Sequence, residues 1–172
     1  MKIICTKDYE DMSQNAAELI AEQIPRKPDS VLGLATGGTP LGIYRRLAEL
    51  YRSGQLDFSS VTSLNLDEYV CMARDDSRSY AYFMQHNLFS HINIPPERCH
   101  IPSHSAKSID AECIRYDYLI QMLGGIDLQL LGLGNNGHIG FNEPSDTFIA
   151  ETHCITLRDS TRSANSRFFS LL

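Results

Sequence analysis

Short apolar runs alternate with longer segments of helical periodicity along the chain. The apolar runs have the length of buried strands, and they cover residues 2–5, 31–35, 61–66, 126–131 and 152–157. In the other segments apolar residues recur every three or four positions, over residues 9–23, 40–53, 79–89 and 109–123, with a further helical start at Ser160. Strands separated by helices build βαβ units and therefore a mainly parallel sheet.

Thr39 and Pro40 predict where the second helix begins. Threonine is a good N-cap and proline suits the first helical position, and Leu41, Tyr44 and Leu47 then share one face. We expect an α/β, Rossmann-like three-layer fold with a mostly parallel sheet and helices on both faces. A chain of 172 residues is large enough for a single domain over residues 1–172.

The overall charge and composition narrow the possible partners. A net charge of −6 argues against nucleic acid, which needs a basic face. No apolar run approaches the roughly 18 residues of a membrane helix, and the N-terminus turns polar too soon for a signal peptide. Five scattered cysteines suit a reduced, cytoplasmic protein better than a disulfide framework. They are Cys5, Cys71, Cys99, Cys113 and Cys154.

The densest chemistry lies in Gly-Leu-Gly-Asn-Asn-Gly-His-Ile-Gly-Phe-Asn-Glu-Pro, residues 132–144, directly after a predicted strand. Chain that follows a strand of an α/β sheet reaches the carboxyl edge, where such folds bind ligands. His138 is the side chain whose unperturbed pKa lies near neutrality, and Glu143 is close enough in sequence to orient it. The alternative is a glycine-rich turn with a solvated histidine.

Two other predicted strands also end in polar residues. Thr36-Gly37-Gly38-Thr39 joins a strand to a helix, and backbone N–H groups at a helix N-terminus attract anions; the alternative is an ordinary βα turn. Asp67 and Glu68 follow the next strand. A carboxylate there can act as a general base, or as a helix-capping or solvated acid. No metal site is predicted.

Four ordered segments resemble the glucosamine-6-phosphate deaminase family of sugar-phosphate aldose–ketose isomerases. Besides residues 132–144 they are residues 34–40, residues 65–69 (Asn-Leu-Asp-Glu-Tyr) and residues 161–169 (Thr-Arg-Ser-Ala-Asn-Ser-Arg-Phe-Phe). The resemblance implies conversion of glucosamine 6-phosphate and water to fructose 6-phosphate and ammonia, with no cofactor. It implies a hexosamine phosphate as the partner, and a homo-oligomer remains open.

The resemblance also assigns roles to individual residues. Asp67 corresponds to the base that moves a proton between C2 and C1, and His138 with Glu143 to the pair that opens the sugar ring. Thr36, Gly37, Gly38 and Thr39 correspond to the phosphate loop, and Arg167 to a further phosphate contact. Guanidinium is a natural bidentate partner of phosphate, although a solvated helix charge is the alternative for Arg167.

Asn136 departs from the family pattern, which often has aspartate there. An amide can orient His138 but cannot stabilise an imidazolium by charge, so the pH profile becomes the property in question. His153 and Ile155 stand where allosteric members carry cations, which argues against activation by an N-acetylated sugar phosphate. The chain ends inside a helical pattern at Leu172, so we expect a form that lacks the family's C-terminal part, including a phosphate-contacting lysine.

Three alternatives to glucosamine-6-phosphate deaminase remain at this point. A galactosamine-6-phosphate deaminase would differ only in the stereochemistry of one hydroxyl of its substrate. A 6-phosphogluconolactonase has a related glycine-rich turn but is not expected to carry Phe141-Asn142-Glu143-Pro144. A non-catalytic sugar-phosphate binder would suit the truncated end and Asn136, but binding alone does not need the base Asp67.

Overall fold

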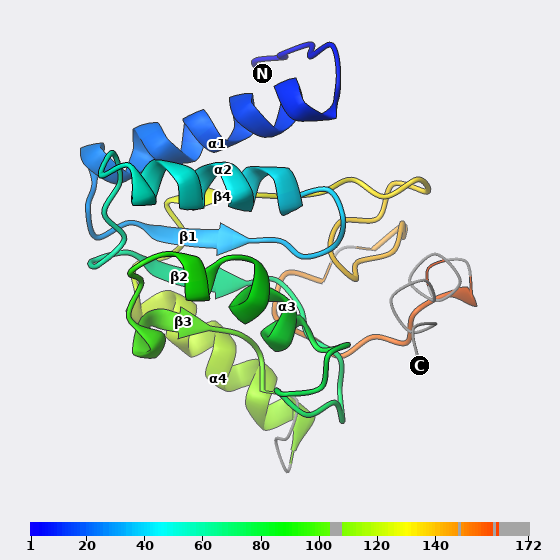
Figure 1. Ribbon diagram of the computed structural model, residues 1–172. Helices are drawn as coiled ribbons and strands as arrows, with labels where there is room; N and C mark the ends of the chain where they lie inside the picture. The colour runs from blue at the N-terminus through cyan, green and yellow to red at the C-terminus, as the bar shows by residue number, and fades with distance from the viewer. Residues whose placement is uncertain (104–107, 148, 160, 162–172) are drawn as a thin grey trace.

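The computed structural model describes residues 1–103, 108–147, 149–159 and 161 (Figure 1). In this part of the chain four parallel strands form one sheet in the order β3-β2-β1-β4. The strands are β1 (Val31–Leu34), β2 (Thr62–Asn65), β3 (Cys99–His100) and β4 (Leu128–Gln129). The α-helices are α1 (Tyr9–Arg26), α2 (Leu41–Arg52), α3 (Tyr80–Asn87) and α4 (Ile109–Met122), and 3-10 turns cover Phe89–His91 and Pro96–Arg98.

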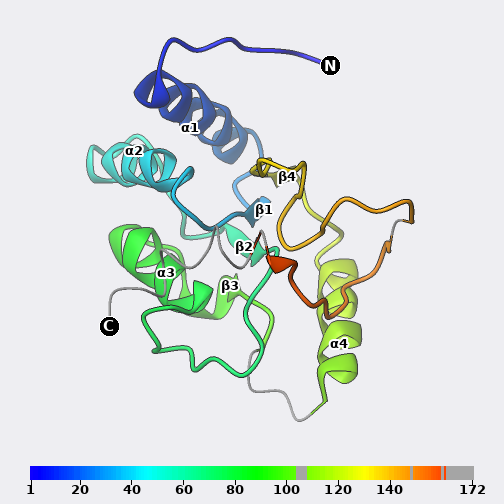
Figure 2. The ribbon, with the colours of Figure 1, turned by 90° about the vertical axis from the view of Figure 1, so that its right-hand side faces the viewer.

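The sheet is the middle of three layers. Helices α1, α2 and α3 lie on one face and α4 on the other (Figure 2). Because side chains alternate along a strand, Leu32 and Leu34 of β1 join the core beneath α1 to α3, while Val31 packs with Tyr116 of α4. This confirms the predicted α/β, Rossmann-like fold with helices on both faces.

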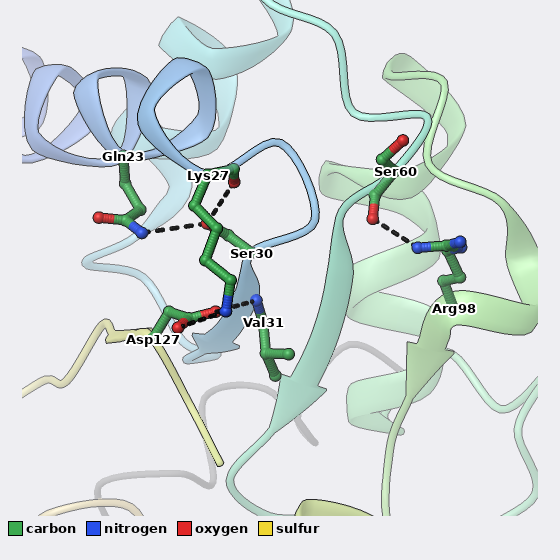
Figure 3. Close-up of polar contacts among 7 residues, drawn as sticks. All are labelled: Gln23, Lys27, Ser30, Val31, Ser60, Arg98 and Asp127. Carbon is green, nitrogen blue, oxygen red and sulfur yellow. Dashed lines mark hydrogen bonds and ion pairs between the residues drawn. The ribbon is translucent and has the colours of Figure 1, made fainter. Parts of the chain in front are cut away.

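Side-chain contacts tie the amino ends of the strands together, opposite the edge that carries the predicted site (Figure 3). Lys27, just after α1, forms an ion pair with Asp127 at 2.7 Å. The same carboxylate accepts a hydrogen bond from the Val31 N–H at 2.8 Å, and Arg98 donates to the carbonyl of Ser60. These contacts align β1 with β4 and β2 with β3, and so fix where their carboxyl ends emerge.

Three strand predictions were wrong in part or in whole. Residues 2–5 form no strand: they precede α1, and the side chains of Ile3 and Ile4 are exposed rather than packed in the core. Residues 152–157 form none either, because Thr152 is held by the Asp117 carboxylate of α4 through its N–H (3.0 Å) and its hydroxyl (2.5 Å). Of residues 126–131 only Leu128–Gln129 pair with β1.

Two smaller corrections concern helix and strand ends. Pro40, not Thr39, is the N-cap of α2, with φ −76° and ψ −6°. The two-residue edge strand β3 was not predicted, since two residues carry no periodicity. The predicted helical start at Ser160 lies outside the described residues, although Asp159 and Thr161 on either side are helical.

Candidate functional site

The predicted site residues follow three neighbouring parallel strands, β1, β2 and β4, at the edge of the sheet where the arrowheads of β1 and β2 point (Figure 1). Residues 36–39 follow β1, Asp67 and Glu68 follow β2, and residues 132–144 follow β4. Parallel strands deliver their carboxyl ends to the same edge, so segments far apart in the sequence meet there.

Asp67 lies against the histidine-bearing loop. Its Oδ2 is 3.2 Å from where a Cβ on Gly140 would stand, and Gly140 has a φ of +58°. Burial, with a smaller contribution from the negative charge of Glu68, raises the pKa of Asp67 from 3.8 to about 7. A carboxylate with such a pKa can both take and return a proton near neutral pH.

The imidazole of His138 is held by the backbone of its own loop. An added Cβ on Gly134 would lie 2.1 to 2.4 Å from three atoms of the ring, so the ring lies flat against that glycine. The Gly134 N–H donates to the His138 carbonyl at 2.8 Å, and the Gly137 N–H donates to the Gly134 carbonyl at 2.9 Å. The glycine at 134 is therefore required by the position of the histidine.

Asn136 stands between the histidine and the glutamate. Its Oδ1 is 2.6 Å from His138 Nδ1 and accepts the His138 N–H at 3.1 Å. Its Nδ2 donates to Glu143 Oε2 at 2.8 Å, and the Thr161 hydroxyl donates to the other oxygen of Glu143. Glu143 was expected to orient His138; in the structure the two side chains are linked through the amide of Asn136, which lies between them.

The hydrogen bonds to Glu143 stabilise its charged form. Donation from Thr161, and less strongly from Asn136, lowers its pKa below the usual value. A carboxylate only accepts, so it selects the amide nitrogen of Asn136 and leaves the amide oxygen for His138. The proton of a neutral His138 then resides on Nδ1, and Nε2 is left with a lone pair.

The loop after β1 has the features of an anion-binding turn. Gly37 has a φ of +100°, and nothing lies within 4 Å of an added Cβ at Gly37 or Gly38. Tyr9 of α1 braces the loop, since its hydroxyl accepts from the Gly42 N–H at 2.9 Å and lies 3.0 Å from the Thr39 carbonyl. Helix α2 starts at this loop, and its dipole favours an anion there.

Sequence reasoning missed the role of α3. The phenol of Tyr80, the first residue of α3, lies within hydrogen-bonding reach of Thr36. Burial raises the pKa of this phenol most, and the negative charge of the nearby Asp67 raises it further. Its ring is 5.0 Å from that of Tyr69 and 5.5 Å from that of Phe141, measured between centroids. The serine cap at Ser79, which places Tyr80 at the start of the helix, was the available signal.

A cavity of about 460 Å³ adjoins the site on the α4 side. Asp67 and Phe141 are among the residues that line it, together with Tyr116, Ile120 and Ile155. Among residues 1–103, 108–147, 149–159 and 161 no cluster of three His, Cys, Asp or Glu side chains could hold a metal ion. The same residues include no helix long and apolar enough to cross a membrane. Arg167 lies outside the described residues.

Comparisons of sequence agree on one family. Residues 7–168 match the family described as glucosamine-6-phosphate isomerases/6-phosphogluconolactonase. A glucosamine-6-phosphate deaminase of Lachnoclostridium phytofermentans is 57% identical over 169 residues, which are 98% of this chain and 72% of that protein. A deaminase of the same name from Clostridium perfringens is 56% identical and is covered over 70% of its length.

Solved structures show the same relationship. A monomeric glucosamine-6-phosphate deaminase superimposes with a TM-score of 0.95 at 49% identity, over 99% of this chain and 70% of the other. The 6-phosphogluconolactonase of Thermotoga maritima superimposes with a TM-score of 0.67 at 24% identity, over 81% of this chain and 63% of the other. The second similarity is one of fold.

Proposed function

The chain belongs to the family of glucosamine-6-phosphate isomerases and 6-phosphogluconolactonases, and from that membership we propose that it converts glucosamine 6-phosphate and water to fructose 6-phosphate and ammonia. The observation that carries the proposal is Asp67, a carboxylate with a pKa near 7 that lies against the loop bearing His138. An aldose–ketose isomerisation needs a base poised near neutrality, and relatives 52–57% identical carry the deaminase name.

Ring opening is the first step. His138 Nε2, free because Nδ1 faces Asn136, takes the proton of the anomeric hydroxyl and delivers a proton to the ring oxygen. The C1–O5 bond breaks and the open-chain aldehyde forms. Glu143 keeps Asn136 in the orientation that this tautomer requires.

Proton transfer between carbons follows. Asp67 removes the proton from C2 while O1 takes up a proton, which gives an enolamine. Asp67 then returns a proton to C1 as the nitrogen gives one up, which leaves an imine at C2. Water adds to the imine, and loss of ammonia gives the C2 ketone of fructose 6-phosphate. No cofactor is invoked, since the amine and carbonyl of the substrate hold the electrons. Burial of Asp67 makes the carboxylate a stronger base than in water.

The phosphate orients the sugar for these steps. Thr36, Gly37, Gly38 and Thr39 offer backbone N–H groups and hydroxyls at the N-terminus of α2, and Arg167 would add a bidentate contact. An anchored phosphate holds C2 near Asp67, which supplies effective concentration.

The other candidate functions are less well supported. A galactosamine-6-phosphate deaminase and a non-catalytic sugar-phosphate binder are not favoured by relatives that share the glucosamine-6-phosphate deaminase name. Non-catalytic binding of a sugar phosphate would also not require a base with a pKa of about 7 at Asp67. A 6-phosphogluconolactonase is included in the description of the family, but the similar solved structures that carry that name are only 19–26% identical to this chain.

The proposed reaction implies a class and a location. It consumes water and releases ammonia, so we classify the enzyme as a hydrolase acting on an amino sugar phosphate, within an isomerase family. We place it in the cytoplasm, where five thiols would stay reduced. A single domain over residues 1–172 and a homo-oligomer remain predictions; the similar solved deaminase is described as monomeric.

Three substrates and one variant test the proposal. The purified chain should release ammonia from glucosamine 6-phosphate faster than from galactosamine 6-phosphate, and should not hydrolyse 6-phosphogluconolactone. Asp67→Asn should lose at least about a hundredfold in kcat while still binding the substrate in calorimetry. Binding of glucosamine 6-phosphate without turnover by the unaltered chain would favour the non-catalytic binder instead.

A further inference from the structure

The N-terminus of α3 is capped from two directions. Ser79 supplies the local cap, since its hydroxyl accepts the Tyr82 N–H at 2.9 Å. Glu68 supplies the other from the loop after β2: Oε1 accepts the Tyr80 N–H at 3.0 Å and Oε2 the Ala81 N–H at 2.8 Å. Together these side chains satisfy the first three N–H groups of the helix, which otherwise lack partners.

The same carboxylate also shapes its own loop. Glu68 Oε1 accepts the N–H of Tyr69 at 2.8 Å. The side chain of Glu68, the residue directly after Asp67, therefore links its own loop at Tyr69 to the first turn of a helix 12 and 13 positions away. A carboxylate at a helix N-terminus gains from the helix dipole as well as from the hydrogen bonds.

The first residue of α3, the helix that Glu68 caps, contacts all three loops of the candidate site. The rings of Tyr80, Tyr69 and Phe141 contact one another in pairs, and the phenol of Tyr80 lies close to Thr36. The three loops that follow β1, β2 and β4 thus meet at the first residue of α3. A shift of α3 relative to the β2 loop would move Asp67 with respect to both the phosphate loop and the His138 loop.

We propose that Glu68 is a positioning residue for the reaction: by binding the N-terminus of α3 it holds Asp67 in register with Thr36 and Phe141. The proposal rests on the proposed function. Its competitor is a purely structural cap, as Ser79 is. The two residues are matched, because each caps the same turn. Glu68 links that turn to Tyr69, close to Asp67, whereas the hydroxyl of Ser79 donates to the Arg74 carbonyl farther along the loop.

The charge of Glu68 gives the role a measurable signature. The ionisable groups around Asp67 are Glu68 beside it, Tyr80 on α3 and Tyr116 on α4. Burial raises the pKa of both tyrosines above the ordinary value, so they stay neutral. Removing the charge of Glu68 should therefore lower the pKa of Asp67 and move the acid limb of kcat/KM to lower pH.

Glu68→Gln and Ser79→Ala separate the two roles. Both should lower the melting temperature, since each removes partners of the α3 N-terminus. We expect only Glu68→Gln to reduce kcat, by about tenfold or more as expected for a displaced base, and to shift the acid limb downward. Glu68→Asp keeps the charge but shortens the reach, so kcat should fall with the limb unmoved. Equal kcat losses and an unshifted limb in Glu68→Gln and Ser79→Ala would overturn the proposal.

A second measurement does not need turnover. A ¹³C NMR titration of the Asp67 carboxyl should give a lower pKa in Glu68→Gln than in the unaltered chain, and exchange of the Tyr80 and Ala81 amide hydrogens should be faster. An unaltered chain that releases no ammonia would defeat the proposed function, and this titration would still decide the role of Glu68. The positioning role of Glu68 would be contradicted if the pKa of Asp67 and the exchange of the two amide hydrogens were unchanged in Glu68→Gln. A Glu68→Gln chain that differs from the unaltered chain only in melting temperature would contradict it as well.

Discussion

The side-chain amide of Asn136 donates to Glu143 Oε2 at 2.8 Å, while its oxygen faces His138 Nδ1 at 2.6 Å. Because the glutamate carboxylate only accepts, it decides which end of the amide points to the histidine. The neutral amide of Asn136 is thus oriented by the charged Glu143, and Nε2 of His138 is left without a proton, as the proposed ring opening requires. This arrangement explains how the site can use asparagine where the family often has aspartate.

Glu143→Gln should remove that preference. A glutamine can donate to Asn136 as well as accept from it, so the amide of Asn136 loses its single orientation. We expect kcat to fall by at least about tenfold, since general acid–base catalysis contributes about a hundredfold or more. ¹⁵N NMR of His138 should show both neutral tautomers. Thr161→Val is the control, because Thr161 binds the other oxygen of Glu143. A Glu143→Gln chain that keeps a single Nδ1–H tautomer of His138 and the original kcat would contradict the account.

The pH dependence of turnover should reflect the pKa of Asp67. The base must be ionised to accept the C2 proton, and burial together with Glu68 raises its pKa to about 7. Activity should therefore rise with pH through a midpoint near 7. An acid limb of kcat/KM near 4, the ordinary range of an aspartate, would show that Asp67 is solvated or is not the base.

The same shift predicts how stability depends on pH. The folded state binds the Asp67 proton more tightly than the unfolded state, for which the pKa is 3.8, so stability should fall as pH rises from about 4 to about 7. Asp67→Asn removes the buried charge. Its stabilising effect should be larger at pH 8 than at pH 5, by up to about 3 kcal/mol. Chemical denaturation at both pH values measures this, with the exposed Asp146→Asn as control; equal effects at both pH values would refute it.

Gly134→Ala should damage the site without unfolding the protein. The new Cβ would stand 2.1 Å from an atom of the His138 ring, and the ring must move away. We expect kcat to fall by about a hundredfold, as for a displaced catalytic group, with little change in melting temperature. Gly132→Ala is the matched control, since nothing lies within 4 Å of its added Cβ. Comparable activity of the two variants would contradict the placement of His138.

The sequence predicted the strands and helices that build the middle of the fold, for physical reasons. Leu32 and Leu34 are buried by α1 to α3 and Tyr44 by the sheet, so their apolar pattern reflects real packing. Residues 152–157 had a similar pattern, but a strand also needs a neighbour with free hydrogen-bonding groups. Thr152 is bound to Asp117 instead, a contact between distant residues that periodicity does not reveal.

In the candidate site too, the local sequence pattern predicted some features, while contacts between side chains could not be predicted from it. The three segments that carry Thr36, Asp67 and His138 could be found because strand ends and glycines mark them. Asn136 between His138 and Glu143, and Tyr80 between three loops, depend on the folded positions of side chains. The role predicted for Arg167 is still a prediction, since that residue lies outside the described part of the chain.

Glucosamine 6-phosphate deuterated at C2 tests the central claim most directly. If Asp67 moves a proton from C2 to C1, the chain releases ammonia and forms fructose 6-phosphate whose deuterium has left C2 and is found at C1 or in solvent. Mass spectrometry and NMR of the product distinguish these positions, and Asp67→Asn should leave the label in unreacted substrate. Ammonia release with the deuterium retained at C2 would mean direct displacement of the amine and would contradict the account, as would the absence of ammonia.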